Sequence, residues 1–121
     1  MPDTKTERLL QEKLPALPGV VCQRSLKHDM DELAAAVLPP GRLAVIDDAH
    51  TAQALGDRAF RALAGRFACT HITLDAPPAA TMEAVEAIRR DAAGCDALAA
   101  VGSGTVSDLC KYASFLDGKP Y

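Results

Sequence analysis

The sequence contains few aromatic residues: no Trp, two Tyr and three Phe among 121 residues. Its core must therefore come from aliphatic side chains, and hydrophobic residues make up 49% of the chain, an ordinary share for a globular domain. A core of Ala, Leu, Val and Ile suits helices packed on a parallel sheet better than a β-sandwich. The length matches one compact domain.

The sequence also lacks a run of Lys or Arg long enough to follow a phosphate backbone, and its formal net charge is −3. Both features argue against a nucleic-acid partner. No apolar stretch approaches the ~18–20 residues of a membrane span. Because the N-terminus is charged and has no apolar signal core, we expect a cytoplasmic protein.

Disulfide and metal-binding patterns are absent from the sequence as well. The four cysteines are Cys22, Cys69, Cys95 and Cys110, and the three histidines are His28, His50 and His71. They form no CxxC pair, and no histidine stands at a metal-ligand spacing. We interpret the cysteines as buried, reduced thiols and predict no metal site in this chain.

Short apolar runs alternate with amphipathic stretches from residue 40 onward. The pattern predicts strands at 43–47, 70–75 and 97–101, and helices at 51–65, 81–94 and 105–117. This βαβαβα order is typical of the α/β class, and we predict a Rossmann-like three-layer domain with a parallel sheet over 40–121. Residues 1–39 form a loosely assigned lead-in with a short helix before Pro15, a strand at 19–26 and a helix that Asp29 caps.

The closing residues 118–121, Gly-Lys-Pro-Tyr, are typical of the lead-in to a further strand. A parallel sheet that ended here would have an open edge and an uncovered apolar face. We therefore expect a truncated chain, the N-terminal part of a longer protein. The open edge also makes a homo-oligomer an expectation to test.

A glycine loop, Gly102-Ser103-Gly104-Thr105, directly follows the third predicted strand. Glycines permit a tight turn and let a ligand approach the backbone. The helix that follows directs its free N–H groups and its positive dipole end at the loop, which suits a pyrophosphate. The alternative is a plain strand-to-helix turn in which Thr105 and Asp108 form a capping box.

Two acids, Asp47 and Asp48, end the first predicted strand. Open parallel sheets bind ligands at the carboxyl ends of their strands, where an acid accepts hydrogen bonds from ribose hydroxyls. The alternative is a solvated loop acid or a helix N-cap. The acids precede the glycine loop, and Ser107 stands where a third glycine would be, so this is not the usual dinucleotide fingerprint.

The last predicted helix carries Lys111 three residues after Asp108. The two side chains lie on one side of the helix, where they either pair with each other or meet the charge of a cofactor or substrate. On the same helix we predict that Tyr112, Phe115 and Leu116 serve packing.

Residues 100–121, AVGSGTVSDLCKYASFLDGKPY, closely resemble the GGGxxxD-A-K segment of the iron-containing alcohol dehydrogenase and dehydroquinate synthase superfamily. Within it they are most similar to the sn-glycerol-1-phosphate dehydrogenase branch. LAVIDDAHT at 43–51 resembles the first nucleotide-binding strand of that branch. The resemblance covers roughly residues 40–121, and the order of acid and glycine loop agrees with it.

The resemblance implies a two-domain enzyme whose N-terminal domain binds NAD(P). Its C-terminal helical domain, beyond position 121, would supply an Asp and two His ligands to zinc or iron. The implied reaction is hydride transfer to dihydroxyacetone phosphate, giving sn-glycerol 1-phosphate for phospholipid metabolism. Because the metal ligands lie outside it, this chain alone is expected to be inactive.

The resemblance also assigns roles by position. The pyrophosphate would be cradled by Gly102, Ser103, Gly104 and Thr105. Asp47 would hold the adenosine ribose, Asp108 would lie near the nicotinamide or the substrate, and Lys111 would support that region. Ser103 departs from the family pattern, because it replaces the middle glycine and puts in doubt any contact that needs a positive φ there.

Three alternatives stay open at the level of the sequence. In the first, the substrate is glycerol or another polyol. In the second, the enzyme is a dehydroquinate synthase-like cyclase of the same superfamily. In the third, the chain is a nucleotide-binding module without catalysis. The cofactor is NAD or NADP. NAD is favoured, because an acid at Asp47 repels a ribose 2′-phosphate.

Overall fold

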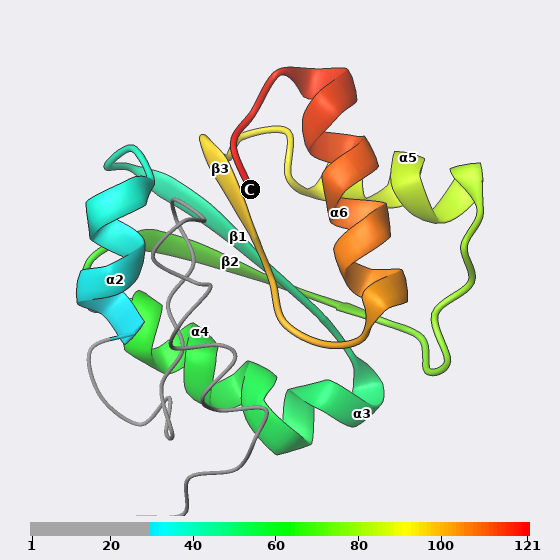
Figure 1. The fold of residues 1–121 in the computed structure, drawn as a ribbon, viewed down its shortest axis with the longest axis horizontal. Coiled ribbons are helices and arrows are strands. Elements are labelled where there is room, and N and C mark those ends of the chain that lie inside the picture. The colour runs from blue at the N-terminus through cyan, green and yellow to red at the C-terminus, as the bar shows by residue number, and fades with distance from the viewer. Residues whose placement is uncertain (1–29) are drawn as a thin grey trace, which may run out of the picture.

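The computed structural model describes residues 30–121 and arranges them in three layers, with helices on both faces of one sheet (Figure 1). The sheet consists of β1 (Arg42–Asp48), β2 (Ala68–Leu74) and β3 (Ala97–Ala100), all parallel, in the order β2-β1-β3. This confirms the predicted α/β fold with a parallel sheet. The helix before Pro15, the strand at 19–26 and the Asp29 cap lie outside the described residues.

Strand β1 forms the centre of the molecule and is buried from its second residue to its last. It pairs with both neighbours, so that Val45 lies opposite His71 of β2 and Ile46 lies opposite Ala100 of β3. Its side chains alternate between the two faces: Leu43 and Val45 pack into one core cluster, whereas Ala44 and Ile46 pack into the other. A continuous apolar run is what a strand covered on both faces requires.

Each face of the sheet has its own pair of helices. One core cluster joins the sheet to α2 (Met30–Val37) and α4 (Asp57–Leu63), and the other joins it to α5 (Met82–Asp91) and α6 (Gly104–Asp117). The connection that leaves β1 runs over the α4 face to β2, and the connection from β2 to β3 runs over the α5 face (Figure 1). The chain therefore leaves β1 and β3 on opposite faces, which makes their carboxyl ends the topological switch point of the sheet.

The helical segment after β1 differs from the single helix predicted over 51–65. It begins earlier, with α3 (Ala49–Thr51), and passes through one π turn, η2 (Ala52–Gly56), before α4. The early start follows from Asp48, which is the N-cap of α3 and accepts hydrogen bonds from the backbone N–H groups of His50 and Thr51.

The two later helices agree closely with the prediction. Thr81 caps α5 by accepting a hydrogen bond from the Ala84 N–H at 3.1 Å. Helix α6 ends at Gly118, whose φ of 65° gives the left-handed C-cap that glycine favours. The alternative capping box of Thr105 and Asp108 is wrong, because Ser103 is the N-cap residue and makes no side-chain capping bond.

The closing residues 119–121 return to the sheet, where the chain end lies beside β3 (Figure 1). The Leu98 N–H donates to the carbonyl oxygen of Pro120 at 3.0 Å. The edge of β3 thus has a backbone partner at this point.

Two predictions about side-chain burial have different outcomes. Cys95 and Cys110 are buried, Cys69 is partly buried, and all three are free thiols; burial raises the pKa of Cys110 to about 12. The prediction that Tyr112, Phe115 and Leu116 serve packing is wrong, because all three side chains are exposed. Phe115 is 76% exposed, and the two rings stack on each other, with centroids 6.5 Å apart, on the solvent side of α6.

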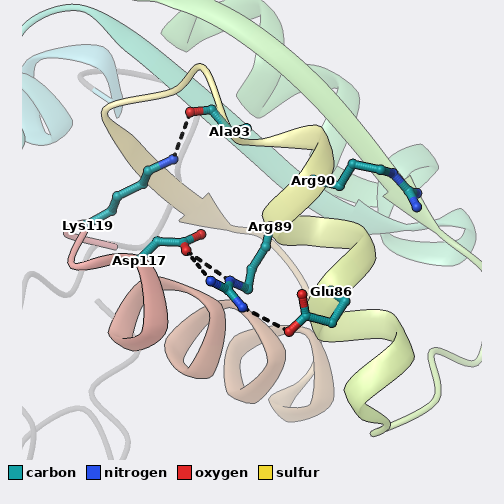
Figure 2. A pocket seen from close by; sticks show the side chains of 6 residues that line it. All are labelled: Glu86, Arg89, Arg90, Ala93, Asp117 and Lys119. Atoms are coloured by element: carbon teal, nitrogen blue, oxygen red, sulfur yellow. Dashed lines mark hydrogen bonds and ion pairs between the residues drawn. The ribbon is translucent and has the colours of Figure 1, made fainter.

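An ion network joins α5 to the end of α6 around a hollow of about 420 Å³ (Figure 2). The Arg89 guanidinium contacts Asp117 at 2.8 Å and Glu86 at 2.9 Å. Lys119 donates to the backbone carbonyl oxygens of Ala92 at 2.8 Å and Ala93 at 3.3 Å, where α5 ends. The network therefore satisfies carbonyl groups that a helix C-terminus leaves open and ties the closing segment to α5.

We expect Asp117→Asn to remove part of the acid sensitivity of the fold. The Arg89 guanidinium lowers the pKa of the Asp117 carboxyl. A carboxyl with a lowered folded-state pKa stabilises the fold above its ordinary pKa, and this contribution disappears as the pH falls through the folded-state pKa. The contribution is small, because solvent screens the pair. Urea unfolding at about pH 7 should show a larger free energy of unfolding for wild type than for the variant. At about pH 3 the difference between the two free energies should be smaller. A gap of equal size at both pH values would contradict this prediction.

Candidate functional site

The loop at 101–104 and the turn at 48–51 meet where β1 and β3 end. The Thr51 hydroxyl donates to the carbonyl oxygen of Val101 at 3.2 Å, and the Val101 N–H donates to the carbonyl oxygen of Ile46 at 2.8 Å. The two segments that the sequence singled out, 55 residues apart, are therefore neighbours at the switch point of the sheet. Crevices of open α/β sheets bind their ligands at this position.

The turn after β1 is held by a reciprocal capping box. The Asp48 carboxylate accepts from the N–H groups of His50 and Thr51, both at 2.9 Å, and the Asp48 N–H donates to the Thr51 hydroxyl at 3.0 Å. The bond from the Thr51 N–H is the main reason that the pKa of Asp48 lies below its ordinary value. Asp48 is thus a fixed, ionised group at the end of β1.

Gly102 is the residue of the loop that needs to be glycine for the protein's own geometry. Its φ is 149°, which side chains rarely tolerate, and a Cβ there would lie 3.1 Å from the Thr51 hydroxyl oxygen and 3.3 Å from Val106 Cγ2. Ser103 has a φ of −71°, which any residue adopts. The replacement of the middle glycine by Ser103 therefore introduces no backbone strain.

Gly104 faces open space instead. It begins α6, and a Cβ built on it would meet no atom of residues 30–121 within 4 Å, apart from its chain neighbours and its own helix. Residues 102–104 are all exposed, and the side chain of the N-cap residue Ser103 makes no capping bond. The first N–H groups of this 14-residue helix, with its positive dipole end, are thus available to an anionic ligand.

Thr105 is half-buried in the first turn of α6, and Asp108 and Lys111 are exposed farther along the helix. No ion pair joins Asp108 and Lys111 within residues 30–121. Both charges are therefore free to meet a ligand that extends from the loop along α6.

Asp47 lies apart from this crevice. Its side chain has no exposed surface, and its Oδ2 lies 2.6 Å from His71 Nε2. The next residue, Asp48, points the other way, because side chains alternate along a strand. In this conformation the Asp47 carboxylate is not presented to a ribose at the crevice.

The structure also brings together a group that sequence spacing did not reveal. One potential ligand atom from each of Asp47, Asp57 and His71 lies within 4.8 Å of the other two. The three residues come from β1, α4 and β2, so no motif spacing marks them. Their donor set, an imidazole nitrogen and carboxylate oxygens, fits a divalent first-row metal ion.

The family model of the iron-containing alcohol dehydrogenases matches residues 23–121, most of the chain. The chain belongs to the iron-containing alcohol dehydrogenase family. This is a family of oxidoreductases, and membership implies a dinucleotide cofactor, a small substrate and a metal ion, iron by the family's description. No curated protein and no solved structure matches the chain. Among the described helices, none is long and apolar enough to cross a membrane.

We expect alanine to have opposite effects at the two glycines of the loop. Gly102→Ala should destabilise the fold by about 1–3 kcal/mol, because it forces a strained φ and a close contact with Thr51. Gly104→Ala should be neutral or slightly stabilising, because it meets open space at the start of a helix. Urea unfolding of both variants checks this. Equal losses of stability would show that the loop has a different backbone from the one described.

Proposed function

We propose that this chain is the nucleotide-binding domain of an NAD(P)-dependent sn-glycerol-1-phosphate dehydrogenase. In the reaction, NAD(P)H gives a hydride to the carbonyl carbon of dihydroxyacetone phosphate, and a proton reaches the carbonyl oxygen. The products are sn-glycerol 1-phosphate and NAD(P)⁺. The observation that carries the nucleotide site is the exposed loop at 102–104, which leads into an uncapped helix beside the end of β1.

The pyrophosphate of the cofactor would lie over this loop. Backbone N–H groups at the start of α6 and the open face of Gly104 leave room for a close approach of phosphate oxygens. Gly102 and Ser103 shape the turn, and the Thr105 hydroxyl in the first turn of the helix offers a further donor. These four positions are the ones that the family resemblance assigns to the pyrophosphate.

The ribose contact expected of Asp47 requires its side chain to leave His71. We therefore assign the ribose to the turn at 48–51, where Asp48, which is 4% exposed, lies beside Thr51 and the β3 loop. The oxygen of Asp48 that caps α3 already accepts two N–H bonds, but an ionised carboxylate has further lone pairs for ribose hydroxyls. An ionised Asp48 repels a 2′-phosphate, which favours NAD over NADP.

The substrate assignment rests on the resemblance of residues 100–121 to the glycerol-1-phosphate branch. Asp108 and Lys111 are exposed on α6, downstream of the proposed pyrophosphate position. There Asp108 would lie near the nicotinamide or the substrate, and the Lys111 ammonium would attract a phosphate group. The alternatives within the superfamily are glycerol, another polyol or a cyclase substrate.

Calorimetric titration with NADH and NADPH tests the nucleotide site. We expect the folded chain to bind NADH more tightly than NADPH, and Gly104→Val to weaken binding at least about tenfold, because the branched side chain fills the space of the phosphate. The variant should keep its fold, since a Cβ at 104 meets no protein atom.

The matched control is Gly65→Val. Gly65 follows α4 in the chain, and a Cβ there would make only an ordinary 3.5 Å contact with the Ala62 carbonyl oxygen. It should bind NADH like wild type. A folded chain that binds neither nucleotide, or a Gly104→Val variant that binds as wild type does, would refute the site.

A further inference from the structure

Asp47 is a buried carboxylate with an unused oxygen. Its side chain has no exposed surface, and while Oδ2 contacts His71, Oδ1 has no hydrogen-bond partner within residues 30–121. Buried carboxylates are costly unless all their lone pairs are engaged or a cation neutralises them. An unpartnered oxygen at this depth thus points to a group that residues 30–121 do not supply.

A second acid and an imidazole converge on the same place. Asp57, in the first turn of α4, and His71, on β2, each bring a ligand atom within 4.8 Å of Asp47 and of each other. The three are graded in exposure: Asp47 is buried, His71 is 22% exposed, and Asp57 is open to solvent. The group is therefore reachable from outside through Asp57 while its inner ligand stays fixed.

The surrounding residues hold this arrangement in place. Phe60 stacks on the His71 ring with the centroids 4.8 Å apart, which fixes the plane of the imidazole. Gly56 ends the π turn directly over Asp47, where any Cβ would overlap the carboxylate. π turns inside helices are frequently found at functional sites. This one brings the backbone close to Asp47 and begins α4 with Asp57.

The charge of the group is unbalanced within residues 30–121. Asp47 and Asp57 have no ion pair with Lys or Arg there, and His71 compensates for one carboxylate only if it is protonated. A divalent cation would neutralise both carboxylates and engage the free oxygen of Asp47.

We propose that Asp47, Asp57 and His71 bind a divalent transition-metal ion of the Zn²⁺ or Co²⁺ type. The imidazole nitrogen favours such ions over Mg²⁺ and Ca²⁺, which prefer all-oxygen sites, and water would complete the coordination. A bound ion would link β1, β2 and α4 beside the capping turn at 48–51. The site does not depend on the nucleotide proposal, because it lies on the α4 face and uses none of the loop residues.

Titration of the 121-residue chain with Co²⁺ and Zn²⁺ tests the site. We expect one equivalent of Co²⁺ to produce visible ligand-field absorption, Zn²⁺ to displace it, and either ion to raise the thermal unfolding midpoint. Asp57→Asn and His71→Gln should each weaken binding at least about tenfold, since a lost ligand has that effect or more. Asp57 is exposed, so its variant should fold, and far-ultraviolet circular dichroism checks this.

Two matched controls exclude loose binding elsewhere. Glu83→Gln removes an exposed acid on α5, and His50→Gln removes an exposed histidine on α3 that does not belong to the ligand group. Both should bind as wild type does. The proposal is overturned if the folded chain binds neither ion, or if Asp57→Asn retains wild-type affinity. Nucleotide titration of the same metal-free samples shows separately whether the nucleotide site is intact.

Discussion

The burial of β1 on every side is the constraint on which the rest of this domain depends. Two strands flank it and helices cover both of its faces, so six consecutive residues are buried. Aliphatic side chains satisfy that condition easily, but the last two residues are acids. Each acid needs a polar partner that another element brings to it. Asp48 finds the N–H groups of α3, and Asp47 finds His71 of β2.

Because the side chains of Asp47 and Asp48 point to opposite faces of the sheet, the domain has two polar centres instead of one. Asp48 faces the end of β3, where the loop at 102–104 opens toward solvent. Asp47 faces α4, where Gly56 leaves space for its carboxylate. A single change in strand register would exchange the two faces and destroy both arrangements, so the apolar alternation of β1 also fixes the chemistry at its end.

The sequence predicts the fold well, because the relevant signals are local. Apolar runs, the cap at Thr81 and the terminator at Gly118 fix elements whose observed ends lie within a few residues of the expected ones. The loop at 102–104 is equally local, since its glycines follow directly on a strand. The predicted start at Thr51 lies two residues late, because Asp48, for which a helix N-cap was one of the alternatives, caps a helix that begins at Ala49.

The remaining features depend on contacts between distant segments. The face of the sheet on which Asp47 lies can be assigned only once the sheet order is known. Its contact with His71 results from the pairing of β1 with β2. Helix α6 has a weak apolar periodicity that does not distinguish its solvent side, and for that reason Tyr112 and Phe115 were assigned to packing. Patterns along the chain predict helices and strands, whereas the side-chain contacts between different strands are known only from the assembled fold.

The two glycines of the loop, Gly102 and Gly104, are restricted for different reasons. A side chain at 102 would strain the backbone and press against Thr51, so that position is restricted by folding alone, whatever the domain binds. A side chain at 104 encounters no protein atom, and glycine is the poorest helix former after proline. If position 104 remains glycine among the relatives of this chain, the ligand and not the fold must be responsible.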